Sequence, residues 1–79
     1  MRDELLDILE DLNPGVDYEN CKRLVSDRHI SSLTMVALIP ELEDAFDVEI
    51  PPVEIIVDNF DSVDAMLALL ERLQDDDLD

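Results

Sequence analysis

Basic, aromatic and cysteine residues are scarce in this sequence, and the scarcity of cysteine excludes two kinds of site. The single cysteine, Cys21, rules out an internal disulfide, and with one histidine in the chain no Cys/His cluster exists to bind zinc. No apolar stretch is long enough and free enough of charge to span a membrane. The segment Met1–Glu4 is charged instead of forming an apolar signal region, so we expect a cytoplasmic protein of bacterial type without membrane insertion.

Most charged residues of the chain are acidic. The chain holds 22 Asp and Glu against 5 Lys and Arg, a formal net charge of −17. Residues 1–31 hold only part of this excess, whereas residues 32–79 contain Arg72 as their only basic residue. Such a field repels nucleic acid and attracts basic protein surfaces to the second half. The alternative interpretation is that the acids only keep a small protein soluble and monomeric, and a monomer is what we expect.

Four segments have the pattern of helices. Residues 3–12 and 32–46 carry apolar residues at spacings of three and four, and a similar helix begins at Asp61, a favoured N-cap residue. Residues 53–59 predict one short helix between them. The three long apolar stripes consist of Leu5, Ile8, Leu9 and Leu12; of Met35, Leu38, Ile39, Leu42 and Phe46; and of Val63, Met66, Leu67, Leu70 and Leu73. The sequence therefore predicts an all-α fold, a small four-helix bundle of three main helices and one short one.

The remaining segments complete one domain over residues 1–79, with a core at about 3–73 and an acidic, frayed tail at 74–79. Residues 16–31 show no sustained period and predict a loop. We expect three of its residues to lie on the core: Leu24, Val25 and Ile30. Residues 47–52 are expected to be extended, because residues before proline avoid the helical region. The short helix is expected to supply core contacts through Ile55, Ile56 and Val57.

Residues for catalysis are not assembled in this sequence. It contains no convincing Ser/His/Asp set, no metal-binding cluster and no glycine-rich phosphate loop. We therefore expect neither an enzyme nor a catalytic or metal site.

Three segments in order carry a resemblance to a known family. They are Asp27–Leu33, Leu42–Pro51 and Asn59–Met66. In turn they resemble the surroundings of the modified serine, the end of the second helix and the start of the last helix in the acyl carrier protein family. The resemblance extends from about Leu5 to Leu73 and implies the four-helix fold of that family.

The resemblance further implies that Ser32, at the amino end of the second helix, carries a 4′-phosphopantetheine arm. In this family a separate transferase, with magnesium, joins the serine oxygen to the arm of coenzyme A, and the thiol of the arm holds acyl groups as thioesters. The amides and dipole of a helix N-terminus tolerate the new phosphate. The expected function is an acyl carrier in fatty-acid, polyketide or related biosynthesis, whose partners are that transferase and the acyl- or aminoacyl-transferring enzymes.

Two residues depart from the family pattern. Ser31 stands where the family usually has Asp, and Arg28 stands where it often has Gly or another small residue. Ser31 is thereby a rival attachment point, although the spacing to Leu33 and to the helical stripe favours Ser32. Ser31 is instead expected to be the N-cap of the second helix.

The second helix also carries the expected docking face for partner enzymes. Apolar residues there are flanked by acids that would meet basic enzyme surfaces, chiefly raising the association rate. The face consists of Leu33, Val36, Pro40, Glu41, Glu43, Asp44 and Asp47. Pro40 removes a helical hydrogen bond at a cost of about 3 kcal/mol, so we expect it on the solvent side. The alternative is a solvated acidic face with a few exposed apolar residues.

Two other functions stay open. An aminoacyl or D-alanyl carrier of cell-wall modification would use the same fold and the same Ser32, with a different loading enzyme. An acidic protein-interaction bundle that lacks the arm is favoured by one feature, the replacement of the usual Asp by Ser31.

Overall fold

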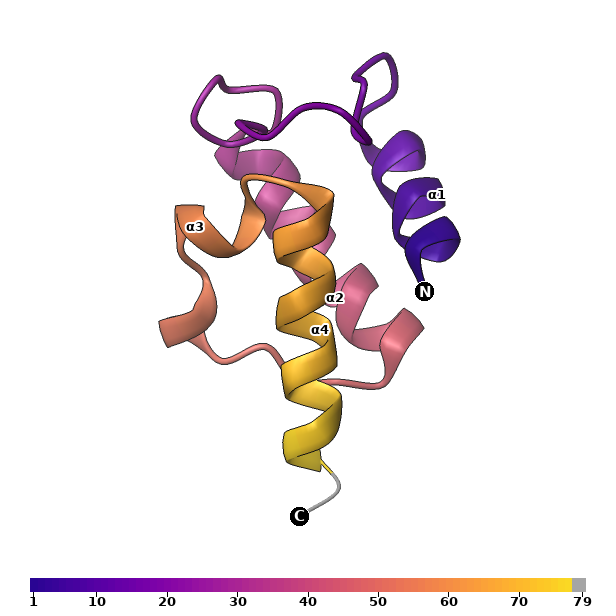
Figure 1. The fold of residues 1–79 in the computed structure, drawn as a ribbon, viewed down its shortest axis with the longest axis vertical. Coiled ribbons are helices and arrows are strands. Elements are labelled where there is room, and N and C mark those ends of the chain that lie inside the picture. Colours follow the sequence, from indigo (N-terminus) through magenta and orange to yellow (C-terminus); the bar gives the residue numbers. More distant parts are fainter. Residues whose placement is uncertain (78–79) are drawn as a thin grey trace.

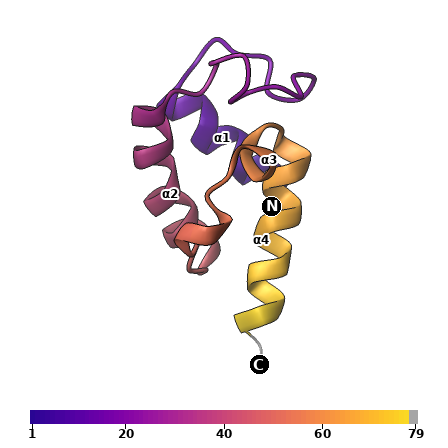
Figure 2. The same ribbon diagram turned by 90° about the vertical axis from the view of Figure 1, so that its left-hand side faces the viewer.

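The computed structural model describes residues 1–77, which form helices joined by loops and contain no strand. The elements are α1 (Arg2–Leu12), α2 (Ser32–Phe46), the short 3-10 helix η1 (Pro52–Glu54), α3 (Val57–Phe60) and α4 (Val63–Asp77). Helix α1 packs against both α2 and α4, and α3 packs against α4. Figures 1 and 2 show the chain from η1 through α3 crossing between the end of α2 and the start of α4. The predicted all-α bundle is confirmed.

One apolar core joins the helices to the loop between α1 and α2. Its buried members are Leu5, Leu9, Tyr18, Leu24, Ile30, Leu38, Leu42, Phe46, Val48, Ile50, Phe60, Val63, Met66, Leu69, Leu70 and Leu73. Leu24 and Ile30 lie on the core as predicted, and Val25 packs against it while partly buried. Burial of Tyr18 within the same loop was not predicted. The loop is therefore a packed part of the molecule, held by at least three buried side chains.

Helix α2 has the predicted limits. Its stripe faces the core through buried Leu38, Leu42 and Phe46, with Met35 and Ile39 partly buried beside them. Pro40 is exposed, as predicted, so the missing amide lies on the solvent side. The helix ends at Asp47, whose φ of 52° is left-handed and whose amide donates to the Glu43 carbonyl. The expectation of extended backbone at Asp47 was wrong, since this residue makes the reversal that ends the helix.

The prediction of one helix over 53–59 with a buried apolar run was wrong. The segment is split into η1 and α3. Ile55 and Ile56, which lie between the two helices, are 40% and 50% exposed, and Val57, the first residue of α3, is 47% exposed. Three consecutive β-branched residues are poor helix formers, and Ile56 is extended, with φ −126° and ψ 156°. Phe60 alone anchors the segment in the core.

The start and end of α4 also differ from the prediction. The N-cap is Ser62, whose hydroxyl accepts from the Ala65 amide at 3.1 Å, and not Asp61, which is engaged elsewhere. At the other end, residues 74–77 continue α4 instead of fraying. Gln74 donates to the Phe46 carbonyl at 3.3 Å, which ties α4 to the end of α2. The last two residues of the predicted tail, 78–79, lie outside the described residues.

Leu38 and Leu33 form a matched pair for testing the core, because both are leucines of α2. Leu38 is 0% exposed and Leu33 is 83% exposed. Leu38→Ala should lower the free energy of unfolding by about 2–5 kcal/mol, as buried leucines do. Leu33→Ala should change it by less than about 0.5 kcal/mol. Urea unfolding followed by circular dichroism measures both, and equal losses would contradict the described orientation of α2.

Candidate functional site

The two adjacent serines before and in the first turn of α2 have different roles. The Ser31 hydroxyl accepts from the Thr34 amide at 3.2 Å and lies 3.1 Å from the Thr34 hydroxyl, so it caps the helix as predicted. Ser32 is the first residue of α2 and is exposed, and its Oγ forms no hydrogen bond within residues 1–77. The structure thus leaves Ser32 with a free hydroxyl and gives the hydroxyl of Ser31 a structural use.

Ser32 borders two open hollows on the surface. The first, of about 320 Å³, lies toward the preceding loop and is lined by Val25, Arg28, Ile30, Ser31, Ser32 and Met35. The second, of about 310 Å³, lies toward α3 and is lined by Val25, Ser32, Met35, Val36, Ile55, Ile56, Val57 and Phe60. A third, of about 270 Å³, continues along α2 between Met35 and Pro40, with Ile55 on the facing side. An apolar surface therefore runs from Ser32 along α2.

Ile55, Ile56 and Val57, which were predicted in the core but are exposed, form the wall of this apolar surface opposite α2. Ile55, Ile56 and Val57 face the hollow that borders Ser32, and Val36 on α2 is 73% exposed on the other side. Sequence reasoning missed this wall because it assigned the apolar run to the core. The unbroken run Ile-Ile-Val, which has no helical period, was the available signal.

Most of the predicted docking residues lie on the surface of α2. Leu33, Val36, Pro40, Glu41, Asp44 and Asp47 are exposed. Glu43 is different: it is only partly exposed, and its carboxylate accepts from the Ile50 amide at 2.9 Å. Its carbonyl also accepts from the Val48 amide at 3.2 Å. Glu43 therefore fixes the turn after α2, and its carboxylate is engaged inside the molecule.

Among the residues that line the hollows at Ser32, the one basic residue is Arg28. Four basic side chains form ion pairs within residues 1–77, and they are Arg2, Lys22, Arg23 and Arg72. Arg28 forms none there, and it lines the hollow that Ser31 and Ser32 border. The first turn of α2 contains no acidic residue. In a strongly acidic chain, this end of α2 is thus a place where an added anion would meet no first-turn carboxylate.

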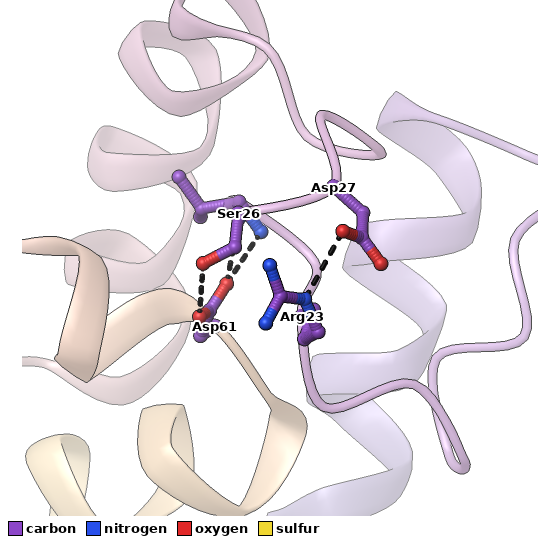
Figure 3. Close-up of polar contacts among 5 residues, drawn as sticks. Arg23, Ser26, Asp27 and Asp61 are labelled. Carbon is purple, nitrogen blue, oxygen red and sulfur yellow. Dashed lines mark hydrogen bonds and ion pairs between the residues drawn. The ribbon is translucent and has the colours of Figure 1, made fainter.

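The loop wall of the site is held from the α3–α4 junction by Asp61. One carboxylate oxygen of Asp61 accepts from the amides of Val25 and Ser26, both at 2.8 Å, and the other accepts from the Ser26 hydroxyl at 2.6 Å. Figure 3 shows Ser26 and Asp61 pointing toward each other, next to the Arg23–Asp27 pair. The hydroxyl and then the amide of Ser26 lower the pKa of Asp61 below its ordinary value.

The same loop is joined to α1 by its buried tyrosine, Tyr18. The Tyr18 hydroxyl donates to the carbonyls of Leu9 and Asn13, and the Asn13 side-chain amide donates to the His29 carbonyl. Burial raises the pKa of Tyr18. His29 thus contributes its backbone to the structure, two residues before the Ser31 cap.

Within residues 1–77, no group of three or more His, Cys, Asp and Glu side chains is arranged to hold a metal ion. Over the same range, none of the helices has the length and apolar character needed to cross a membrane. Comparisons of the chain with protein-family models, curated proteins and solved structures find no match.

Arg28 has a left-handed backbone, with φ at 64°, where an L side chain costs about 1–2 kcal/mol. Arg28→Gly removes this cost. Glycine also makes the unfolded chain more flexible, which destabilises the folded state by about 0.5–1 kcal/mol. We expect the variant to be more stable in urea unfolding by up to about 1.5 kcal/mol, as the difference of these two effects. Arg28→Ala removes the same charge but keeps a Cβ, and it should not stabilise. Equal stabilities of the Gly and Ala variants would contradict the backbone explanation.

Proposed function

We propose that this protein is a carrier that holds acyl groups on a 4′-phosphopantetheine arm attached to Ser32. The observation that carries the proposal is the difference between two neighbouring serines. The Ser31 hydroxyl caps α2, whereas the Ser32 hydroxyl is free and exposed at the first position of that helix. The resemblance of the segments around Ser32, after α2 and before α4 to the acyl carrier family supports the same proposal.

The surroundings of Ser32 fit the attachment of such an arm. Attachment replaces a hydroxyl with a phosphodiester, which carries negative charge. The first turn of α2 has no acidic residue, and the Arg28 side chain borders the same hollow as Ser32. Helix amides and a cation would therefore surround the phosphate. Ser32 Oγ has no basic partner within residues 1–77, so its activation falls to a separate transferase.

The arm would supply a terminal thiol that holds acyl groups as thioesters. The role of this chain is to bind partner enzymes beside that arm. The exposed apolar residues Leu33 and Val36 lie close to Ser32 on α2, and the exposed acids Glu41 and Asp44 follow on the same helix. Acids of this kind raise the association rate with basic enzyme surfaces, and the apolar residues bury area after the encounter.

An acidic interaction bundle without an arm is the second candidate. The observation in its favour is apolar exposure that continues beyond the neighbourhood of Ser32, since Val53 in η1 is 79% exposed. An aminoacyl or D-alanyl carrier would use the same serine, and the enzyme that loads the thiol distinguishes it from an acyl carrier.

Incubation with coenzyme A, magnesium and a promiscuous phosphopantetheinyl transferase tests the proposal by intact mass spectrometry. The wild-type chain and Ser31→Ala should each gain the mass of one arm, whereas Ser32→Ala should gain none. Ser31→Ala is the matched control, because it alters the neighbouring hydroxyl and loses only a helix cap worth about 1 kcal/mol. No gain by wild type with several transferases would reject the carrier and leave the interaction bundle.

Charge reversal at Glu41 and Asp44 tests the docking face without disturbing the turn that Glu43 holds. Glu41→Lys combined with Asp44→Lys should lower kcat/KM for arm transfer by about tenfold at low ionic strength, with the difference shrinking as salt is added. Asp3→Lys combined with Asp7→Lys, on α1, makes the same change of net charge away from the face. Equal losses in both double variants would show that only net charge matters.

A further inference from the structure

We propose that Asp61 is a positioning residue for Ser32, fixing the loop wall beside the attachment site so that the hydroxyl meets the transferase in one geometry. This inference rests on the proposed function and adds a residue remote from Ser32 in sequence. Its basis is the set of contacts between the α3–α4 junction and the loop that precedes α2.

Asp61 holds the loop through both its side chain and its backbone. The carboxylate accepts three hydrogen bonds, from the Val25 amide, the Ser26 amide and the Ser26 hydroxyl. The Asp61 carbonyl accepts a fourth bond, from the Leu24 amide at 2.8 Å. Bonds from neutral donors to a carboxylate are about twice as strong as bonds between neutral groups. Three consecutive loop amides thus depend on a single residue.

The held segment is the one that shapes the surroundings of Ser32. Val25 lines both hollows that border Ser32, and Ile30 lines one of them. The Ile30 amide donates to the Leu24 carbonyl at 2.9 Å, so the turn that leads to the Ser31 cap closes on the segment that Asp61 fixes. The connection from Asp61 to Ser32 therefore runs through backbone hydrogen bonds and buried Leu24 and Ile30.

Within residues 1–77, the Asp61 carboxylate forms no hydrogen bond other than these three to Val25 and Ser26. Ser62 caps α4, so the helix does not need Asp61 for its own amides. The contrast with Asp64, three residues later, is informative. Asp64 pairs with Arg2 at 2.8 Å and Lys22 at 3.6 Å, through exposed side chains that do not border the hollows at Ser32. Asp64 is therefore a matched control, with the same residue type and charge, whose one ion pair to the loop goes to exposed Lys22 and not to a residue that lines the hollows at Ser32.

The test compares steady-state arm transfer from coenzyme A to wild type, Asp61→Ala, Ser26→Ala and Asp64→Ala, using one transferase with magnesium. A misplaced nucleophile slows the chemical step, so Asp61→Ala should lower kcat by about ten- to a hundredfold with KM for the carrier little changed. Ser26→Ala keeps the two bonds from loop amides and should show a smaller loss of kcat. Asp64→Ala should match wild type within about twofold, because exposed ion pairs contribute little.

The outcomes separate the inference from the function on which it rests. Partial unfolding of Asp61→Ala would dilute the folded carrier, raising the apparent KM with kcat retained, and that pattern would overturn positioning. Wild-type kcat in both Asp61→Ala and Ser26→Ala would also overturn it while leaving Ser32 as the attachment site. If Asp61→Ala does not fold, Ser26→Ala alone tests the inference: a lowered kcat supports positioning, and a wild-type kcat overturns it. Failure of wild type itself to accept the arm would reject the proposed function and this inference with it.

Discussion

The three hydrogen bonds to the Asp61 carboxylate hold the loop between α1 and α2 in place, and the shape of the Ser32 site depends on them. A loop without helix or strand has no regular partners for its amides, and amides left unpaired in a packed segment are costly. Asp61 satisfies those of Val25 and Ser26. On the other side of the loop, Tyr18 donates to the carbonyls of Leu9 and Asn13, and the Asn13 side chain donates to the His29 carbonyl. Buried Leu24 and Ile30 then set the depth of the loop against the core.

This arrangement divides the acidic residues into two groups with different physical roles. Asp61, Asp64 and Glu43 each accept hydrogen bonds or ion pairs that join separate segments of the chain. Glu41 and Asp44 lie exposed on α2, the helix that carries the apolar surface beginning at Ser32, and we propose that their field attracts partner enzymes. The high negative charge therefore does not serve solubility alone. Asp61 holds the loop beside Ser32, whereas Glu41 and Asp44 stay exposed to solvent.

The sequence predicted those features that depend on local pattern. The limits of α2, its buried stripe and the Ser31 cap all followed from helical spacing and from the preference of serine for N-caps. The prediction of one helix over 53–59 was wrong because Ile55, Ile56 and Val57 are consecutive apolar residues without helical spacing. Apolar character alone does not say whether such a run faces the core or a surface hollow. The prediction that Asp61 caps α4 was wrong for another reason. Asp and Ser are both good N-caps, and the competing partner of Asp61 lies 35 residues away at Ser26, at a distance that no local pattern reveals.

The central claim is that Ser32, and not its neighbour, is the nucleophile that this fold presents. Fragmentation mass spectrometry of the wild-type chain, digested after reaction with coenzyme A, magnesium and a phosphopantetheinyl transferase, tests it without any substitution. We predict one added arm, with fragment ions that assign the added mass to Ser32 while Ser31 remains unmodified. Added mass on Ser31, or an unmodified peptide after reaction with several transferases, would contradict it.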